Sequence, residues 1–283
     1  MVLEALTYGF VQKALISGIA VALICSFMGT FLVLRRYSLF GDGIAHVAFG
    51  GIAVGLFLGV FPLLAAYVVS IGGSLGLQKL RQSTKISGDA AVAVVLVSGL
   101  AVGVILVSSS GGFSVDLFSF LFGSILLISN EDTIMILGIS AGIITTLVVL
   151  HKQFLHLTFD EEQAKLSGLP VTLLNYAFVI LASITVVTSM RLVGILLISA
   201  LIVLPNITAM MFGRGFKKTL GISMLISVAS VISGILLSYY YNVAPSGTIV
   251  VVAVAILIGV LVLRSAGLIS QIDVKKQPQL AHS

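Results

Sequence analysis

Long apolar runs alternate with short charged clusters along the chain, and this alternation restricts its possible folds more than any other feature. Each run has about twenty residues, enough for a helix to cross a hydrocarbon core of roughly 30 Å. Only 9% of the 283 residues are charged, and no stretch remains that could form a separate soluble domain. The sequence therefore predicts an all-α polytopic membrane protein, with residues 1–283 as a single transmembrane domain.

Clusters of lysine and arginine predict the orientation of these runs, because such clusters stay on the cytoplasmic side of a membrane. The clusters place the N-terminus outside and the C-terminus in the cytoplasm, and only Arg191 falls on the outer side. The net charge of +5 therefore reflects orientation rather than a nucleic-acid partner. The nine predicted spans cover residues 10–34, 42–60, 62–79, 87–109, 133–150, 172–190, 192–211, 220–240 and 248–263.

A tenth apolar stretch, residues 115–129, is too short to cross the membrane and begins with an acid, Asp116. If it did cross, the basic loop at residues 152–165 would move outside, against the charge rule. We therefore expect a short re-entrant or interfacial helix. Asp116 either caps this helix or belongs to an outer gate.

One polar segment stands out within the apolar part of the chain. Residues 35–51 read RRYSLFGDGIAHVAFGG, which places Asp42 and His46 four residues apart. On a helix that begins near Asp42, the two side chains emerge on one face, one turn apart. Ionisable groups inside a span are costly and are retained mostly where they face a cavity, a partner or a transported ion. The pair is therefore the predicted metal site of a permeation pathway.

Two structural alternatives apply to this pair. Asp42 could be the N-cap of its helix, and His46 could be a core histidine bonded to a backbone carbonyl. The depth of the pair is also open, because Arg36 lies only six residues before Asp42. A continuous helix would leave Asp42 roughly 10 Å from the inner surface at 1.5 Å per residue, whereas an extended stretch at residues 37–41 would carry it deeper.

A polar loop at about residues 152–170 is predicted to hold a short cytoplasmic helix. Thr158 or Asp160 could cap its start, and Gly168 followed by Pro170 would end it. Such a helix between two spans is either a docking element for a partner or an ordinary surface connection. The residues predicted to couple to a partner are Asp160, Glu161, Glu162, Ala164 and Gly168.

Pro205 and Asn206 lie within the predicted span 192–211. Irregular backbone at membrane depth is tolerated where it is buried in protein or lines a cavity, so we expect both residues near the pathway or its gate. At the end of the chain, residues 272–283 are predicted to be a disordered tail.

Several catalytic motifs are missing from the sequence. It contains no Gly-x-x-x-x-Gly-Lys-Ser/Thr phosphate loop, no His-Glu-x-x-His and no Gly-x-Ser-x-Gly. Its single cysteine, Cys25, excludes a disulfide framework and a cysteine metal site. We therefore expect a chain that is not an enzyme and does not itself hydrolyse ATP. The few charged residues left in the spans also disfavour a proton relay.

The Gly-Asp-x-x-x-His core of residues 35–51 resembles the signature of the permease subunits of bacterial and archaeal zinc and manganese ATP-binding-cassette importers. Other segments agree with that family in order and spacing over nearly the whole chain. Asn206 departs from the pattern, because relatives commonly have small apolar residues after the proline. The agreeing segments are 115–123, before the central span, 160–170, the coupling helix, and 199–205 and 245–247, two later membrane motifs.

The resemblance implies a fold similar to that of the vitamin B12 and siderophore (type II) importer permeases, in the membrane of a prokaryotic cell. It also implies a homodimer with one pathway at its interface, two cytoplasmic ATPase subunits and an extracytoplasmic metal-binding protein. Asp42 and His46 would then be the ligands of a transported divalent metal, with no cofactor bound permanently.

Zinc is the expected cargo, because residues 115–123 resemble the zinc-type permeases more than the manganese type. Nitrogen and oxygen ligands suit manganese or iron as well, so an importer of either metal is the first alternative. A stand-alone metal channel or secondary carrier is the alternative from another class. The predicted cytoplasmic helix disfavours it, because such a protein needs no docking surface for an ATPase.

Overall fold

The computed structural model describes residues 8–83, 88–109, 115–124 and 128–266. Within these residues the protein is helical and has no strand. The predicted disordered tail, 272–283, lies outside the described residues. The helices are α2 (Gly9–Leu34), α3 (Phe40–Leu58), α4 (Pro62–Ser83), α5 (Gly88–Ser109), α6 (Val115–Phe122), α7 (Asn130–Val149), α8 (His151–Phe159), α9 (Glu161–Leu166), α10 (Val171–Val193), the 3-10 turn η1 (Ile195–Leu197), α11 (Ile198–Met210), α12 (Phe216–Tyr241) and α13 (Pro245–Ser265).

Among the described residues, eight helices are long and apolar enough to cross a membrane, which confirms an all-α polytopic membrane protein. These eight and the shorter α11 account for the nine predicted runs. The run at 192–211 is interrupted at Gly194, where φ is +80°, so that α11 has only 13 residues. At 1.5 Å per residue α11 is about 20 Å long, less than the thickness of the hydrocarbon core.

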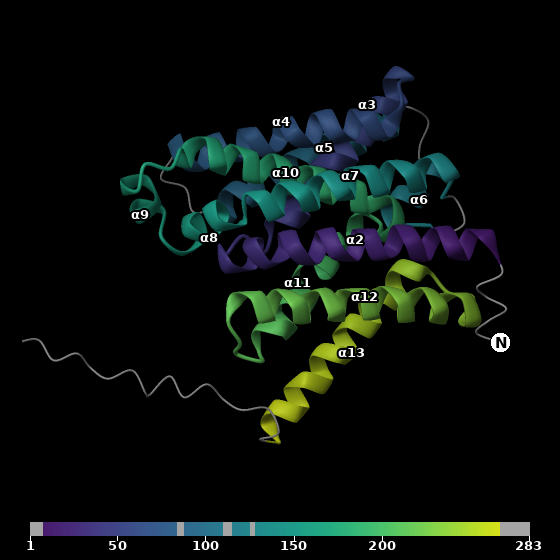
Figure 1. Cartoon of the computed structure of the whole chain (residues 1–283). Coiled ribbons are helices and arrows are strands. Elements are labelled where there is room, and N and C mark those ends of the chain that lie inside the picture. The colour runs from purple at the N-terminus through teal and green to yellow at the C-terminus, as the bar shows by residue number, and fades with distance from the viewer. Residues whose placement is uncertain (1–7, 84–87, 110–114, 125–127, 267–283) are drawn as a thin grey trace, which may run out of the picture.

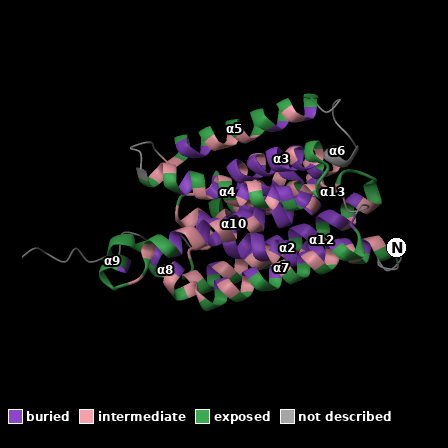
Figure 2. Ribbon diagram, turned by 90° about the horizontal axis from the view of Figure 1, so that it is seen from above, coloured by how far each residue is buried: buried purple, intermediate pink, exposed green. Residues whose placement is uncertain are grey.

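Helix α2 forms the centre of the bundle and is buried along most of its length. It packs against α7, α10, α11 and α12, while α3 packs against α4 and α5 on the other side of α10 (Figure 1). Figure 2 shows that α2 and α10 are largely buried, whereas α5 lies at the edge with much of its surface exposed. A helix that is apolar on all sides, such as α2, is expected in the interior of a bundle.

The two ends of the bundle are built differently. α8 and α9 lie at one end and α6 lies at the opposite end (Figure 1). α6 has eight residues, about 12 Å of helix, and so does not span, as predicted for this stretch. Two glycines with positive φ, Gly123 and Gly194, meet there, and a Cβ on Gly194 would lie 2.5 Å from the carbonyl oxygen of Leu121. No larger residue fits at this contact, which explains the break before α11.

Candidate metal site and coupling segment

Asp42 and His46 lie in the first two turns of α3. The N-cap of α3 is Leu39, so the interpretation of Asp42 as the N-cap is wrong. The ring nitrogen Nδ1 of His46 lies 2.9 Å from the backbone oxygen of Asp42 and 3.7 Å from its carboxylate. Because a carbonyl oxygen can only accept, Nδ1 is the donor in this bond, and in the neutral imidazole Nε2 is then the nitrogen that can bind a metal. A hydrogen bond of this kind to a backbone carbonyl fixes the orientation of an imidazole that binds a metal.

The histidine therefore combines features of both interpretations made from the sequence. It bonds a carbonyl, as a core histidine would, but through only one of its two nitrogens. Its side chain keeps 15% exposure and that of Asp42 keeps 33%. An ionisable side chain that is exposed at the side of a span needs a neighbour other than lipid. The other residues of this chain do not fully surround either side chain.

The neighbouring helices define the depth of the pair. Gly99 lies at the midpoint of α5, and a Cβ placed on it would be 3.0 Å from the backbone oxygen of His46. Gly73 lies at the midpoint of α4, and its Cβ would be 2.8 Å from the side chain of Val47. His46 is therefore level with the middle of two long spans, so the pair lies well inside the bundle.

A tight turn connects α2 to this site. The amide of Tyr37 donates to the carbonyl of Leu32 at 2.8 Å, and Arg36 adopts φ of +59°. The guanidinium of Arg81 lies over the ring of Tyr37 at 3.9 Å, a cation–π contact that holds the turn against α4. Residues 37–39 thus form a turn and residues 40–41 already belong to α3, so this stretch is not extended, and the depth of the site comes from where α3 begins.

The predicted cytoplasmic helix is two helices. α8 continues almost directly from α7 and ends at Phe159, and α9 follows with only six residues. The carboxylate of Asp160 accepts from the amide of Gln163 at 2.8 Å, which identifies Asp160 and not Thr158 as the N-cap of α9. Gly168, at φ of +79°, reverses the chain before α10, as the Gly-x-Pro pattern predicts.

A chain of polar contacts joins α9 to the end of α2. Asn175 of α10 donates to Glu161 at 2.9 Å and accepts from Arg35 at 2.9 Å. Burial lowers the pKa of Arg35 to about 10, while the negative charge of Glu161 acts in the opposite direction. Arg35 therefore stays charged at neutral pH, and its guanidinium also lies over Phe178 at 4.5 Å. Asn175 had no sequence signal beyond being a polar residue near the start of a span.

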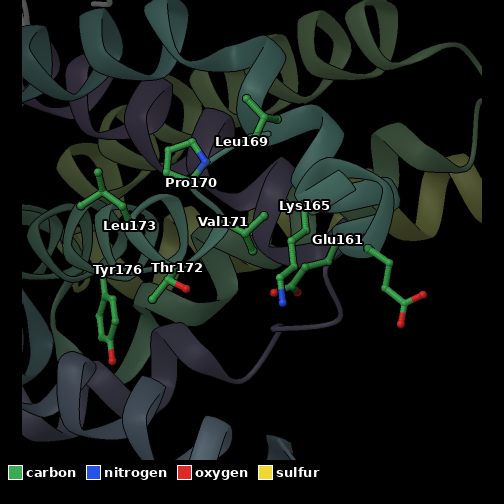
Figure 3. Close-up of a pocket in the computed structure, with 9 residues that line it drawn as sticks. Glu161, Lys165, Leu169, Pro170, Val171, Thr172, Leu173 and Tyr176 are labelled. Atoms are coloured by element: carbon green, nitrogen blue, oxygen red, sulfur yellow. The ribbon is translucent and has the colours of Figure 1, made fainter. Parts of the chain in front are cut away.

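A cavity of about 920 Å³ opens between α9 and the start of α10. Figure 3 shows Glu161 and Lys165 of α9 on one side of it and Thr172 and Tyr176 of α10 on the other. Ala164 is the buried residue of α9. Glu162 is exposed and also lines the cavity. Of the residues predicted to couple to a partner, Glu161, Glu162 and Ala164 thus lie on α9, while Asp160 and Gly168 flank it.

The side-chain hydrogen bonds of Asn206 are not with the Asp42/His46 pair. α11 continues through Pro205, and Asn206 is fully buried. The amide oxygen of Asn206 accepts from Thr30 at 2.6 Å and from Ser223 at 2.7 Å, and its nitrogen donates to Ile202 at 2.7 Å. Asn206 thus ties α11 to α2 and α12, which gives this buried amide a role in helix packing. A role in the pathway stays a prediction.

Two residues at the end opposite α9 form an ion pair that the sequence analysis missed. Arg191 is paired with Asp132, which also closes a capping box with Ser129 at the start of α7. A signal was present, because Arg191 was the one basic residue predicted on the outer side and Asp132 was an acid predicted on that side. The side chain of Asp116 lies outside the described residues, so its role stays a prediction.

The described residues contain no group of three or more His, Cys, Asp and Glu that could hold a metal ion. Asp42 and His46 therefore offer two candidate side-chain ligands. One chain offers an incomplete coordination sphere, because zinc sites use four ligands.

Comparisons with known proteins identify the family of the chain. The family model described as "ABC 3 transport family" matches residues 7–264. The manganese transport system membrane protein MntC of Halalkalibacterium halodurans is 30% identical over 250 residues, which cover 88% of this chain and 86% of that protein. The high-affinity zinc uptake system membrane protein ZnuB of Haemophilus influenzae is 33% identical over 239 residues, 84% of this chain and 91% of that protein.

Solved structures show the same fold. PsaBC from Streptococcus pneumoniae, solved in complex with Fab, superposes with a TM-score of 0.83 at 30% identity, over 92% of this chain and 95% of that chain. A metal-chelate type ABC transporter in an inward-facing conformation superposes with a TM-score of 0.71 at 15% identity, over 89% and 85%. The resemblance to the permeases of metal importers and to the type II importer fold is thereby confirmed, and the chain belongs to the ABC 3 transport family.

Proposed function

We propose that the chain is the permease subunit of an ATP-driven importer of a divalent transition metal, and that Asp42 and His46 bind the ion in transit. The observation that carries the proposal is the pair itself. His46 presents a free Nε2 beside a carboxylate, level with the middle of α4 and α5. A transport site must bind the ion yet release it, which favours a few exposed ligands over a closed cage.

A homodimer would complete this site. The carboxylate of Asp42 is one-third exposed at a depth where lipid is an unsuitable neighbour. A two-fold axis beside this face would cover it with the same surface of a second copy. Two carboxylates and two imidazoles would then surround one ion, a set that suits tetrahedral zinc.

Zinc is the cargo we propose, with manganese or iron as the alternatives. Imidazole and carboxylate ligands alone accept all three metals, and the named relatives include both a manganese and a zinc system. The absence of a thiolate ligand fits a site that must release its metal. The choice between these metals therefore depends on a transport measurement.

α9 is proposed as the contact for a partner ATPase subunit. Phe159, at the end of α8, and Leu166, at the end of α9, are 68% and 88% exposed, which is unusual for large apolar side chains outside the lipid-facing spans. The polar chain through Glu161, Asn175 and Arg35 leads from α9 to the turn before α3. ATP-driven movement of α9 would thus reach the end of the helix that carries the metal ligands.

The test is uptake into liposomes that contain the permease, its ATPase subunit and the metal-binding protein. Asp42→Ala and His46→Ala should each abolish zinc uptake while the complex still assembles. Asp89→Ala and His156→Ala are matched controls, because both residues are exposed and lie outside the pair; these variants should transport normally. Manganese and iron are measured in parallel, and the metal with the highest rate identifies the cargo.

Two results would contradict the proposal. If both Asp42→Ala and His46→Ala transport as the wild type does, the pair is not the site of transit. If the permease alone moves metal down its gradient at the rate of the full assembly, the chain is a channel or a secondary carrier and α9 has no coupling role.

A further inference from the structure

A strongly basic cavity lies at the same end of the bundle as α9 but on a different face. Its volume is about 710 Å³, and it lies between the start of α8 and the turn that joins α11 to α12. Five of its lining residues are basic or imidazole-bearing, and none is acidic. They are His151, Lys152, Arg214, Lys217 and Lys218.

The cations of this cavity are not neutralised by the protein. In the part of the chain that the structure describes, no carboxylate forms an ion pair with Lys152, Arg214, Lys217 or Lys218, and all four side chains are exposed. Four positive charges around one hollow repel one another and attract an anion. Positive charges that only set the orientation of the spans in the membrane do not need to surround one cavity.

The remaining lining is apolar, which restricts the chemistry of the anion. Leu155 and Phe216 line the same cavity as the cations. On the membrane side of the cavity, α7 ends in Val149, which is 71% exposed, and α12 presents Leu225, which is 72% exposed. Lys218, which lines the cavity, and Leu225 are seven residues apart, almost two full turns, and so lie on nearly the same face of α12. A basic hollow therefore continues into an exposed apolar strip.

We propose that this cavity binds the phosphate headgroup of an anionic phospholipid, with the acyl chains against the exposed faces of α7 and α12. Basic pockets between membrane helices at the cytoplasmic boundary are suited to such headgroups. The acidic surface of a partner protein would match the charges but would leave the apolar strip without a role. The bound lipid would join α8, which leads into α9, to the turn between α11 and α12.

The experiment uses the full-length permease in nanodiscs of phosphatidylcholine with a rising fraction of phosphatidylglycerol. Native mass spectrometry counts the phosphatidylglycerol that stays bound. The pocket variant Lys217→Gln/Lys218→Gln is compared with Lys79→Gln/Arg264→Gln, which removes two exposed charges outside the cavity. At about fivefold per charge near the surface, the pocket variant should bind phosphatidylglycerol about 25-fold more weakly, and the control within twofold of wild type.

Three outcomes would overturn the proposal. Equal loss of lipid in both double variants would mean that surface charge acts without a site. Displacement of the lipid by millimolar inorganic phosphate would indicate a site for a soluble phosphate. Unchanged lipid binding together with loss of the co-purifying ATPase subunit would assign the surface to protein docking. If the double variant does not fold, Lys217→Gln alone is used, and the expected weakening is about fivefold.

Discussion

Replacing Gly99 with alanine is expected to disable metal uptake although Gly99 is not a ligand. A Cβ at this position would lie 2.7 Å from the Cα of Val47, 2.9 Å from its amide nitrogen and 3.0 Å from the backbone oxygen of His46. All three atoms belong to the backbone of α3 and cannot rotate away. Because carbon atoms pack at about 3.5–4.0 Å, α3 and α5 must separate locally by about 1 Å.

A shift of that size is large for a metal site, in which ligand distances hold to about 0.2 Å. Displaced metal ligands typically lower affinity or activity about tenfold to a hundredfold, and we expect zinc uptake to fall by that factor. The extra methyl should also cost about 1–3 kcal/mol of stability through overpacking. Uptake is measured in the liposomes described above, and stability by thermal unfolding in detergent.

Gly138→Ala is the matched control, since this glycine lies in α7 with no atom within 4 Å of its added Cβ. It should transport and unfold as the wild type does. If Gly99→Ala is folded, assembled and transports within twofold of wild type, the close approach of α3 and α5 does not position His46, and the reasoning about the site is refuted.

Three further predictions test other contacts. Asp132→Asn should lower the free energy of unfolding by about 1–3 kcal/mol. This is less than for a fully buried ion pair, because Arg191 is 27% exposed. A double-mutant cycle with Arg191→Gln measures the interaction energy of the pair, and additive effects of the two substitutions would contradict the prediction. Asn175→Leu should leave ATP hydrolysis intact and reduce uptake, because it breaks the link to Glu161; unchanged uptake per ATP would exclude a coupling role. Asn206→Leu removes two interhelical hydrogen bonds of about 0.6 kcal/mol each. It should lower the unfolding temperature without changing which metal is transported fastest. A changed metal preference would indicate that Asn206 lines the pathway.

The spans and the Asp42/His46 pair could be predicted because they depend on local properties of the sequence. A run of twenty apolar residues has few options other than a membrane helix. The i, i+4 spacing of an acid and a histidine places them on one face of any helix. The stop at Gly168 followed similarly from residues adjacent in the chain.

The missed features join residues that are distant in the sequence. Arg191 meets Asp132 across 59 positions, and Arg35 meets Asn175 across 140. Spacing carries no information about such pairs. The same limit applies to Asn206, which was predicted near the pathway as a break in a span, whereas Thr30 and Ser223 surround it in the interior.

The sequence by itself determined the class of protein, the helical spans and the pairing of Asp42 with His46 on one helix face, because hydrophobicity and helical periodicity act over short distances. Only the tertiary structure decided the depth of the pair, since that depends on where α3 begins relative to α4 and α5. Gly99 lets the backbone of α5 meet that of α3 at His46 and Val47, and Gly73 of α4 leaves room for the side chain of Val47. The depth of a residue in a bundle depends on how the neighbouring helices pack against it, and the sequence around that residue does not specify this packing.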